Sequence, residues 1–142
     1  MIYCVEDDNS IRELVVYTLN STGFEGRGFS NADDFWEGMK EKFPELIILD
    51  EPFSGFDPVN AQLIRQEILR LKEEGATVIL STHNMETVEQ LCDSIALINK
   101  SRLVVAGETD TIRRQYGDNN VELIYSDDSG RHTEIIPVEK DS

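Results

Sequence analysis

The sequence has 142 residues, with 28 Asp or Glu against 13 Lys or Arg, so its formal net charge is −15 at pH 7. This length suits one domain with a sizeable core. The acidity excludes a duplex-binding protein, which needs a basic face, and adhesion to an anionic membrane. No apolar run approaches the roughly 20 residues of a membrane span, and no basic segment precedes the first apolar run, as it would in a signal peptide. We therefore expect a cytoplasmic protein with no membrane insertion and no nucleic-acid partner.

Short apolar runs alternate with longer amphipathic stretches from the N-terminus to residue 99. The runs predict buried strands, and the stretches, with apolar residues three or four apart, predict helices. Ser10, Asn31 and Asn84 are the predicted N-caps, and Gly23 and Gly75 are predicted to follow helix ends. The predicted strands are residues 2–5, 24–29, 46–50, 76–82 and 94–99, and the predicted helices are residues 10–23, 31–43, 58–75 and 84–93.

This alternation predicts an α/β fold, a three-layer sandwich with a five-stranded parallel sheet between helices. We expect the flavodoxin-like strand order 2-1-3-4-5, because the first two strands bring their own helices and short loops. Later residues predict a hairpin over 94–108, a short helix over 109–117 and a β-hairpin over 120–138. These hairpins are expected as additions to a single domain, residues 1–142.

Three stretches in the first third of the chain carry a family resemblance: IYCVEDDNSIRELV at 2–15, ADDFWE at 32–37 and PELIILD at 44–50. Residues 1 to about 50 thereby resemble a response-regulator receiver domain. The resemblance implies that Glu6 and Asp7 bind Mg²⁺ and that Asp50 accepts a phosphoryl group. Three carboxylates that meet at strand ends repel one another, so they would hold a hard dication.

The receiver resemblance weakens after its acceptor aspartate. A receiver continues there with an apolar residue, whereas this chain has Glu51. The Ser or Thr that ends a receiver's fourth strand has candidates in Ser81 and Thr82, but Lys100, the candidate for the lysine after the fifth strand, is interpreted as a solvated turn residue. The acids at 6–8 also suit a helix N-terminus, which favours negative charge, and this interpretation stays open beside the metal site.

A second resemblance begins where the first ends, and its motifs are LIILDEP at 46–52, SGFDP at 54–58 and VILSTHNMETVEQLCDSIALINKSRLVVAGE at 78–108. Residues 44 to about 138 resemble the Walker B to switch-histidine half of an ABC-transporter ATPase domain, a P-loop NTPase. The resemblance implies that Asp50 supports Mg²⁺ and Glu51 polarises the attacking water. It also implies that His83 contacts the γ-phosphate and that Asp57 lies at a dimer interface.

Two motifs of that ATPase family are absent from the sequence: the phosphate-binding GxxxxGK[ST] and the signature LSGGQ. The first supplies the backbone N–H groups and the lysine that cradle the phosphates. We therefore expect no ATP hydrolysis, with Asp50, Glu51 and His83 as vestigial catalytic residues and no cofactor-binding residues. No cofactor is expected to be required, and Mg²⁺ on Glu6, Asp7 and Asp50 is the one candidate ligand.

The two resemblances overlap at one strand, which predicts a chimera without evolved activity, natural or engineered. Its segments would be a receiver-like part at 1–43, an ABC-ATPase-like part at 44–116 and a β-hairpin tail at 117–142. One alternative is a receiver-like signalling module that binds Mg²⁺ and is phosphorylated on Asp50. Another is a degenerate nucleotide-binding domain that lacks Walker A. Metal binding and nucleotide binding separate the two alternatives.

Overall fold

The computed structural model describes residues 1–54, 57–117, 120–127 and 129–137. The chain divides into two compact units, Met1–Leu91 and Cys92–Ser142, and each is described by itself. The elements of the first unit are β1 (Ile2–Val5), α1 (Asn9–Ser21), β2 (Gly26–Phe29), α2 (Ala32–Glu41), β3 (Leu46–Asp50), α3 (Pro58–Glu73), β4 (Thr77–Ser81) and α4 (Met85–Leu91). The predicted α/β class is confirmed in this unit.

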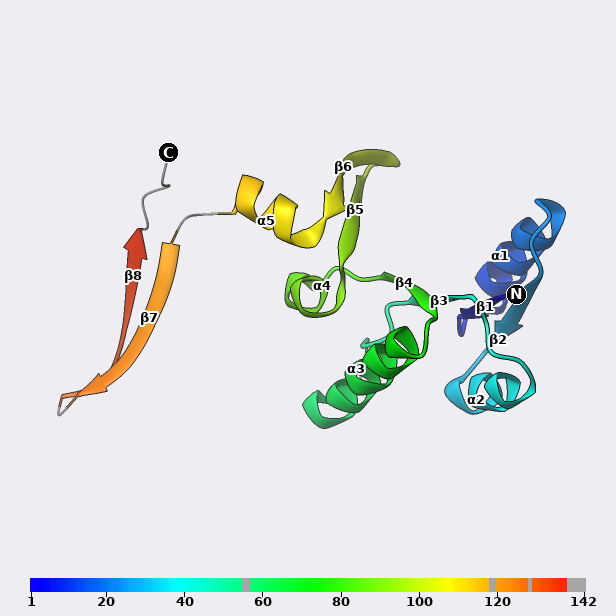
Figure 1. The fold of residues 1–142 in the computed structure, drawn as a ribbon, viewed down its shortest axis with the longest axis horizontal. Helices are drawn as coiled ribbons and strands as arrows, with labels where there is room; N and C mark the ends of the chain where they lie inside the picture. The colour runs from blue at the N-terminus through cyan, green and yellow to red at the C-terminus, as the bar shows by residue number, and fades with distance from the viewer. Residues whose placement is uncertain (55–56, 118–119, 128, 138–142) are drawn as a thin grey trace. The chain divides into compact units, whose positions relative to one another are not determined.

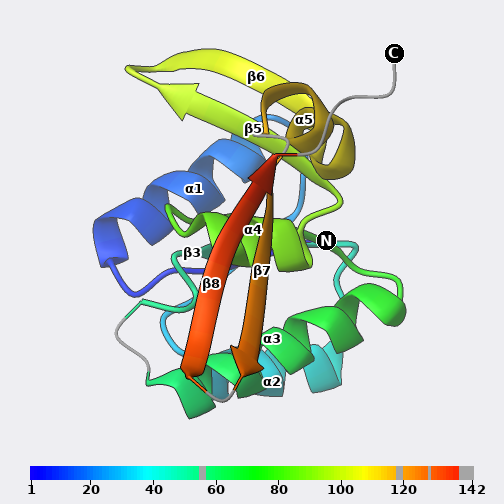
Figure 2. The same cartoon turned by 90° about the vertical axis from the view of Figure 1, so that its left-hand side faces the viewer.

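The first unit is built on a four-stranded sheet with the order β2-β1-β3-β4. All three strand pairs are parallel, and in the β3–β4 pair Leu46 lies opposite Thr77 and Asp50 opposite Ser81. Figures 1 and 2 place α1 on one face of the sheet and α2 and α3 on the other. Right-handed crossovers explain this arrangement. The chain moves to one side of β1 to form β2 and then to the other side to form β3 and β4, so the helix of the first connection lies on the opposite face from the helices of the next two. All four strands therefore end at the same edge, and that edge carries the acids considered below.

The core of this unit lies between the sheet and the α2–α3 layer. Its buried members are Tyr3, Phe29, Phe35, Ile47, Leu71 and Ala76. The rings of Tyr3, Phe29 and Phe35 contact one another edge to face, and each such pair adds about 0.5–1.5 kcal/mol beyond the area that it buries. The Tyr3 hydroxyl lies 3.0 Å from the carbonyl of Gly38 and 2.8 Å from that of Lys42, so it ties β1 to the end of α2.

Side chains at the helix N-termini explain where the helices begin. Asn31 caps α2 by accepting from the Asp34 N–H at 2.9 Å, as predicted. The predicted Ser10 cap of α1 is wrong, because Asp8 precedes it and accepts from the Ile11 N–H at 3.0 Å. Asp57 caps α3, whose first residue is Pro58, since proline suits the first turn.

The described residues of the second unit form two antiparallel strand pairs and one helix. Its elements are β5 (Ser94–Asn99), β6 (Arg102–Glu108), α5 (Thr109–Tyr116), β7 (Asn120–Asp127) and β8 (Gly130–Pro137). The β5–β6 turn consists of Lys100 and Ser101, at φ 47° and 58°, which is the handedness of tight hairpin turns. The predicted hairpins and short helix are confirmed, and Lys100 is an exposed turn residue.

The prediction of a five-stranded parallel sheet is not confirmed, although the order of β1 to β4 agrees with it. Within the described ranges, β5 is hydrogen-bonded to β6 alone, in a separate two-stranded ladder. The reason is the two-residue turn after Asn99, which returns the chain antiparallel along β5. An apolar run such as SIALIN has the same pattern in both kinds of pairing.

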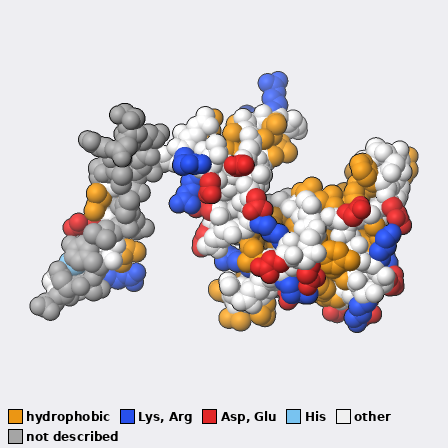
Figure 3. Space-filling view, viewed as in Figure 1, with side chains coloured by type: hydrophobic (Ala, Val, Ile, Leu, Met, Phe, Trp, Pro, Cys, Tyr) orange, Lys and Arg blue, Asp and Glu red, His pale blue; other side chains and the backbone are white. Residues whose placement is uncertain are grey.

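Hydrophobic side chains also reach the surface of the first unit. On α1 the exposed fractions are 49% for Ile11, 64% for Leu14 and 71% for Tyr17, and Figure 3 shows hydrophobic side chains over this helix.

None of the described helices is both long and apolar enough for a membrane crossing.

Candidate functional site

Asp50 and Ser81 form the centre of the candidate site. They are the last residues of β3 and β4 and lie opposite each other in the parallel register. The Ser81 hydroxyl donates a hydrogen bond to Asp50 Oδ1. A carboxylate beside a hydroxyl at the carboxyl edge of a parallel sheet is placed where such sheets bind ligands.

Glu51 turns away from the strand immediately after Asp50. Its φ of 42° lies in the left-handed region, where non-glycine residues are uncommon. Its backbone N–H donates to the Ser81 carbonyl at 3.0 Å and to Ser81 Oγ at 3.3 Å. The backbone of Glu51 is therefore fixed by β4 as well as by its own strand.

The Glu51 side chain meets His83 on the segment that follows β4. Glu51 Oε1 lies 2.7 Å from His83 Nδ1 and accepts from the His83 backbone N–H at 3.1 Å. The His83 side chain is 89% exposed and that of Glu51 34%. A carboxylate paired with an open imidazole can accept a proton from water and orient a polar substrate group.

Glu6 brings a third acid to this edge, from the residue after β1. It is 7% exposed. The Asp8 N–H donates to Glu6 at 2.9 Å and lowers its pKa, but burial, the hydrogen bond with Asp7 and the charges of Asp50 and Asp7 act against this, so the pKa of Glu6 is raised overall. The charge of Asp50 is one of the causes that raise the pKa of Glu6.

The loop that carries Glu6 and Asp7 is held by Arg12 of α1. Arg12 Nη1 donates to the carbonyls of Glu6 at 2.7 Å and Asp7 at 3.2 Å, and Nη2 donates to Asn9 Oδ1 at 2.6 Å. This role was not predicted from the sequence. Its one signal in the sequence is a basic residue in the first turn of the helix that follows the acids at 6–8.

A metal at this edge would meet oxygen donors, which is the chemistry that Mg²⁺ prefers. Asp50 fits this use, because Mg²⁺ is usually bound by one or two carboxylates together with substrate phosphates and water. Among the residues that the structure describes, no group of three or more His, Cys, Asp or Glu side chains is arranged to hold a metal ion. The three-carboxylate site of Glu6, Asp7 and Asp50 stays a prediction.

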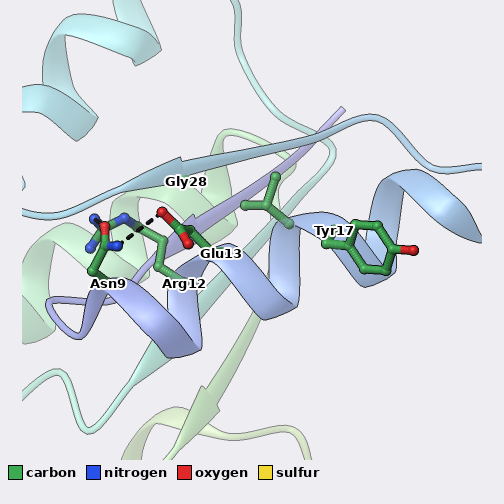
Figure 4. Close-up of a pocket in the computed structure, with 6 residues that line it drawn as sticks. Asn9, Arg12, Glu13, Tyr17 and Gly28 are labelled. Carbon is green, nitrogen blue, oxygen red and sulfur yellow. Dashed lines mark hydrogen bonds between the residues drawn. The ribbon is translucent and has the colours of Figure 1, made fainter.

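A shallow groove between α1 and β2 is a separate feature, shown in Figure 4. It is lined by Asn9, Arg12, Glu13, Val16, Tyr17 and Gly28. Its polar groups bond to one another, since Asn9 Nδ2 donates to Glu13 Oε1 at 2.9 Å and Arg12 donates to Asn9. The groove therefore offers few polar groups to a ligand.

Asp57 has a structural role in the fold, as the N-cap of α3. Its Oδ1 accepts from the N–H groups of Val59 and Asn60, each at 3.0 Å. These bonds make it the cap of α3, and the interface role that the ABC resemblance implies stays a prediction.

Comparison with known families matches residues 34–89 to the model of an AAA domain, described as a putative AbiEii toxin of a type IV toxin–antitoxin system. An uncharacterized ABC transporter ATP-binding protein of Bacillus subtilis, YhaQ, is 36% identical over 138 residues, which is 89% of this chain and 45% of that protein. A further uncharacterized ABC transporter ATP-binding protein, from Methanocaldococcus jannaschii, is 38% identical over 114 residues, 74% of this chain and 44% of that protein.

Among solved structures, an ATP-binding subunit of an ABC transporter is 40% identical, with a TM-score of 0.48, over 52% of this chain and 31% of that chain. This chain spans less than half the length of these relatives.

These comparisons correct the receiver and chimera predictions. The matched AAA domain begins at residue 34, inside the segment predicted to be receiver-like, and crosses the predicted junction at residue 44 without a break. The match to the Bacillus protein covers 89% of the chain, more than residues 44–138 alone can supply. One of the three stretches behind the receiver resemblance, PELIILD at 44–50, is also part of the ABC resemblance, because both families place an apolar strand that ends in Asp there. The predictions of a chimera, a de novo protein and a response regulator are therefore wrong. The alternative of a receiver-like signalling module that is phosphorylated on Asp50 is wrong as well.

Proposed function

We propose that this chain provides the magnesium- and water-handling part of an ABC-type ATP-binding protein. The observation that carries the proposal is the cluster of Asp50, Glu51, Ser81 and His83 at the carboxyl ends of β3 and β4. Relatives over most of the chain are named as ABC transporter ATP-binding proteins, which supports the same reading.

The proposed roles follow from the contacts of each side chain. Asp50 would hold Mg²⁺, which would neutralise phosphate charge when bound. Glu51, beside an open imidazole, would orient and deprotonate the attacking water. The His83 side chain is 89% exposed. With both ring nitrogens protonated, it would donate from Nδ1 to Glu51 and from Nε2 to a terminal phosphate.

The phosphates require a further anchor, because GxxxxGK[ST] does not occur in the 142 residues. Backbone N–H groups and a lysine normally share this task in P-loop proteins. The proposal therefore gives this chain by itself weak affinity for Mg²⁺–ATP.

The relatives' names also lead us to propose a cytoplasmic location and a membrane-embedded transporter partner. In this proposal the partner supplies the membrane contact.

Binding of trinitrophenyl-ATP tests the proposal, measured by its fluorescence with Mg²⁺ and with EDTA. We expect weak binding that requires Mg²⁺ and that falls at least tenfold in Asp50→Asn, a change of about 1.4 kcal/mol in binding free energy. Glu51→Gln should retain binding, because an amide oxygen still accepts from the His83 N–H. The matched control is Glu89→Gln on the exposed side of α4. Absence of Mg²⁺-dependent binding, or equal binding by Asp50→Asn, would overturn the proposal.

A further inference from the structure

We infer that Ser81 is the positioning residue of this site and holds both acids, Asp50 and Glu51, in working geometry. The inference rests on the proposed function and extends it to a residue that would act through Asp50 and Glu51. Its basis is that one hydroxyl bonds to two consecutive acids from the neighbouring strand.

The first contact fixes the side chain of Asp50. Because Asp50 and Ser81 are register partners at the ends of adjacent parallel strands, their side chains leave the sheet on the same face. The Ser81 O–H donates to Oδ1 and so engages one carboxylate oxygen. This hydrogen bond restricts rotation of the carboxylate and so fixes the direction in which its second oxygen, Oδ2, can bind a cation.

The second contact fixes the backbone of Glu51. A residue other than glycine keeps a left-handed backbone conformation only when the surrounding structure holds it in that conformation. Here the Glu51 N–H is held by the Ser81 carbonyl at 3.0 Å and by its Oγ at 3.3 Å. The same backbone turn delivers the Glu51 carboxylate to His83, with 2.7 Å between Oε1 and Nδ1.

The hydroxyl is suited to this double role because it donates one hydrogen bond and accepts others. It donates to Asp50 and accepts from Glu51, so the positions of the two acids depend on each other through one oxygen atom. Alanine would remove both contacts, while threonine retains the hydroxyl and suits a strand.

The test compares Ser81→Ala and Ser81→Thr with Thr77→Val, a control that removes a hydroxyl from the exposed first residue of the same strand. The first readout needs no ligand: the NMR shifts of the Asp50 side-chain carboxyl carbon and the Glu51 amide. The second is the Mg²⁺ concentration that gives half-maximal trinitrophenyl-ATP binding.

We expect Ser81→Ala to move both NMR signals and to raise the Mg²⁺ midpoint at least fivefold. Ser81→Thr should restore both, and Thr77→Val should change neither. Unchanged signals and an unchanged midpoint in Ser81→Ala would overturn the inference alone. If the wild type shows no Mg²⁺-dependent nucleotide binding, the proposed function fails, and the NMR shifts still decide whether Ser81 positions the two acids.

Discussion

Glu6 is the acid whose surroundings disfavour its charge most clearly. Its pKa is raised, since burial and the neighbouring acids outweigh the Asp8 N–H that lowers it. A raised folded-state pKa means that the folded protein binds this proton before the unfolded chain does as the pH falls. Glu6 therefore costs stability at neutral pH, and this cost disappears as the pH falls through the raised pKa toward the ordinary value of 4.5.

We accordingly predict that Glu6→Gln melts at a higher temperature than the wild type at pH 7. The amide keeps the acceptor for the Asp8 N–H, and the charge is gone. The difference should shrink toward pH 4.5, where the wild-type carboxyl becomes neutral in the folded protein. Circular dichroism melts at several pH values measure this, with Glu89→Gln as the exposed control. A Glu6→Gln protein that is less stable at pH 7 would contradict the prediction.

The predicted Mg²⁺ site of Glu6, Asp7 and Asp50 has its own test. A bound cation relieves the repulsion among these carboxylates and stabilises the folded state by mass action. We predict that millimolar Mg²⁺ raises the melting temperature of the wild type and that the rise disappears in Asp7→Asn and Asp50→Asn. An equal rise in all three proteins would mean that the ion only screens the net charge of −15.

At the scale of elements, α3 begins at an exposed cap, Asp57. Asp57 accepts from two backbone N–H groups and from the Asn60 side-chain amide at 2.8 Å. The pKa of Asp57 is lowered, chiefly by the Asn60 backbone N–H and also by Val59 and the Asn60 amide. The stabilisation by the charged cap is present at neutral pH and is lost as the pH falls through the lowered pKa, below 3.8.

We predict that Asp57→Ala lowers the free energy of unfolding, because the first N–H groups of α3 lose their acceptor. Asp57→Asn should lose much less, because asparagine also caps well, and it should lack the acid-dependent loss. Urea titration at pH 7 and at pH 3.5 distinguishes the three proteins. Equal stability of wild type and Asp57→Ala at pH 7 would assign this residue to interactions other than the cap.

The elements show what a sequence can and cannot predict. The start of α2 was predicted from its cap, Asn31. The start of α1 was predicted wrongly, because Ser10 is a good capping residue but Asp8, two residues earlier, is the cap. The acids of the site were predicted because carboxylates at strand ends are visible in the sequence. The hydrogen bonds of Ser81 to Asp50 and Glu51 were not predicted, since they depend on the register of β4 against β3.

At the scale of the whole chain, the prediction of a single domain can be tested by unfolding. Trp36 lies in the first unit, while far-UV circular dichroism reports both units. An isolated two-stranded hairpin is marginal in water, and the second unit contains two such ladders. We therefore predict that Trp36 fluorescence and circular dichroism change at the same urea concentration. Two separated transitions would show that the units unfold independently.

The motifs present in the whole sequence also lead to a prediction about ATP hydrolysis. Since GxxxxGK[ST] does not occur in the 142 residues, we expect no anchored phosphate beside Glu51. Positioning accounts for most of the rate of phosphoryl transfer. We predict no steady ATP hydrolysis by this chain alone at millimolar ATP and Mg²⁺. Phosphate release by the wild type and Glu51→Gln is the measurement, and a steady rate that Glu51→Gln abolishes would show that the chain holds ATP by other means.

The pairing of Asp50 with Ser81 has a consequence for changes in chain length. Side chains of a strand alternate between faces, so one residue inserted within β4 would turn Ser81 to the opposite face and separate it from Asp50. An insertion of the same size between Glu73 and Thr77 would leave the strand's phase intact, as a longer loop can absorb it. A single inserted residue should therefore be tolerated between Glu73 and Thr77 and excluded from the five residues of β4.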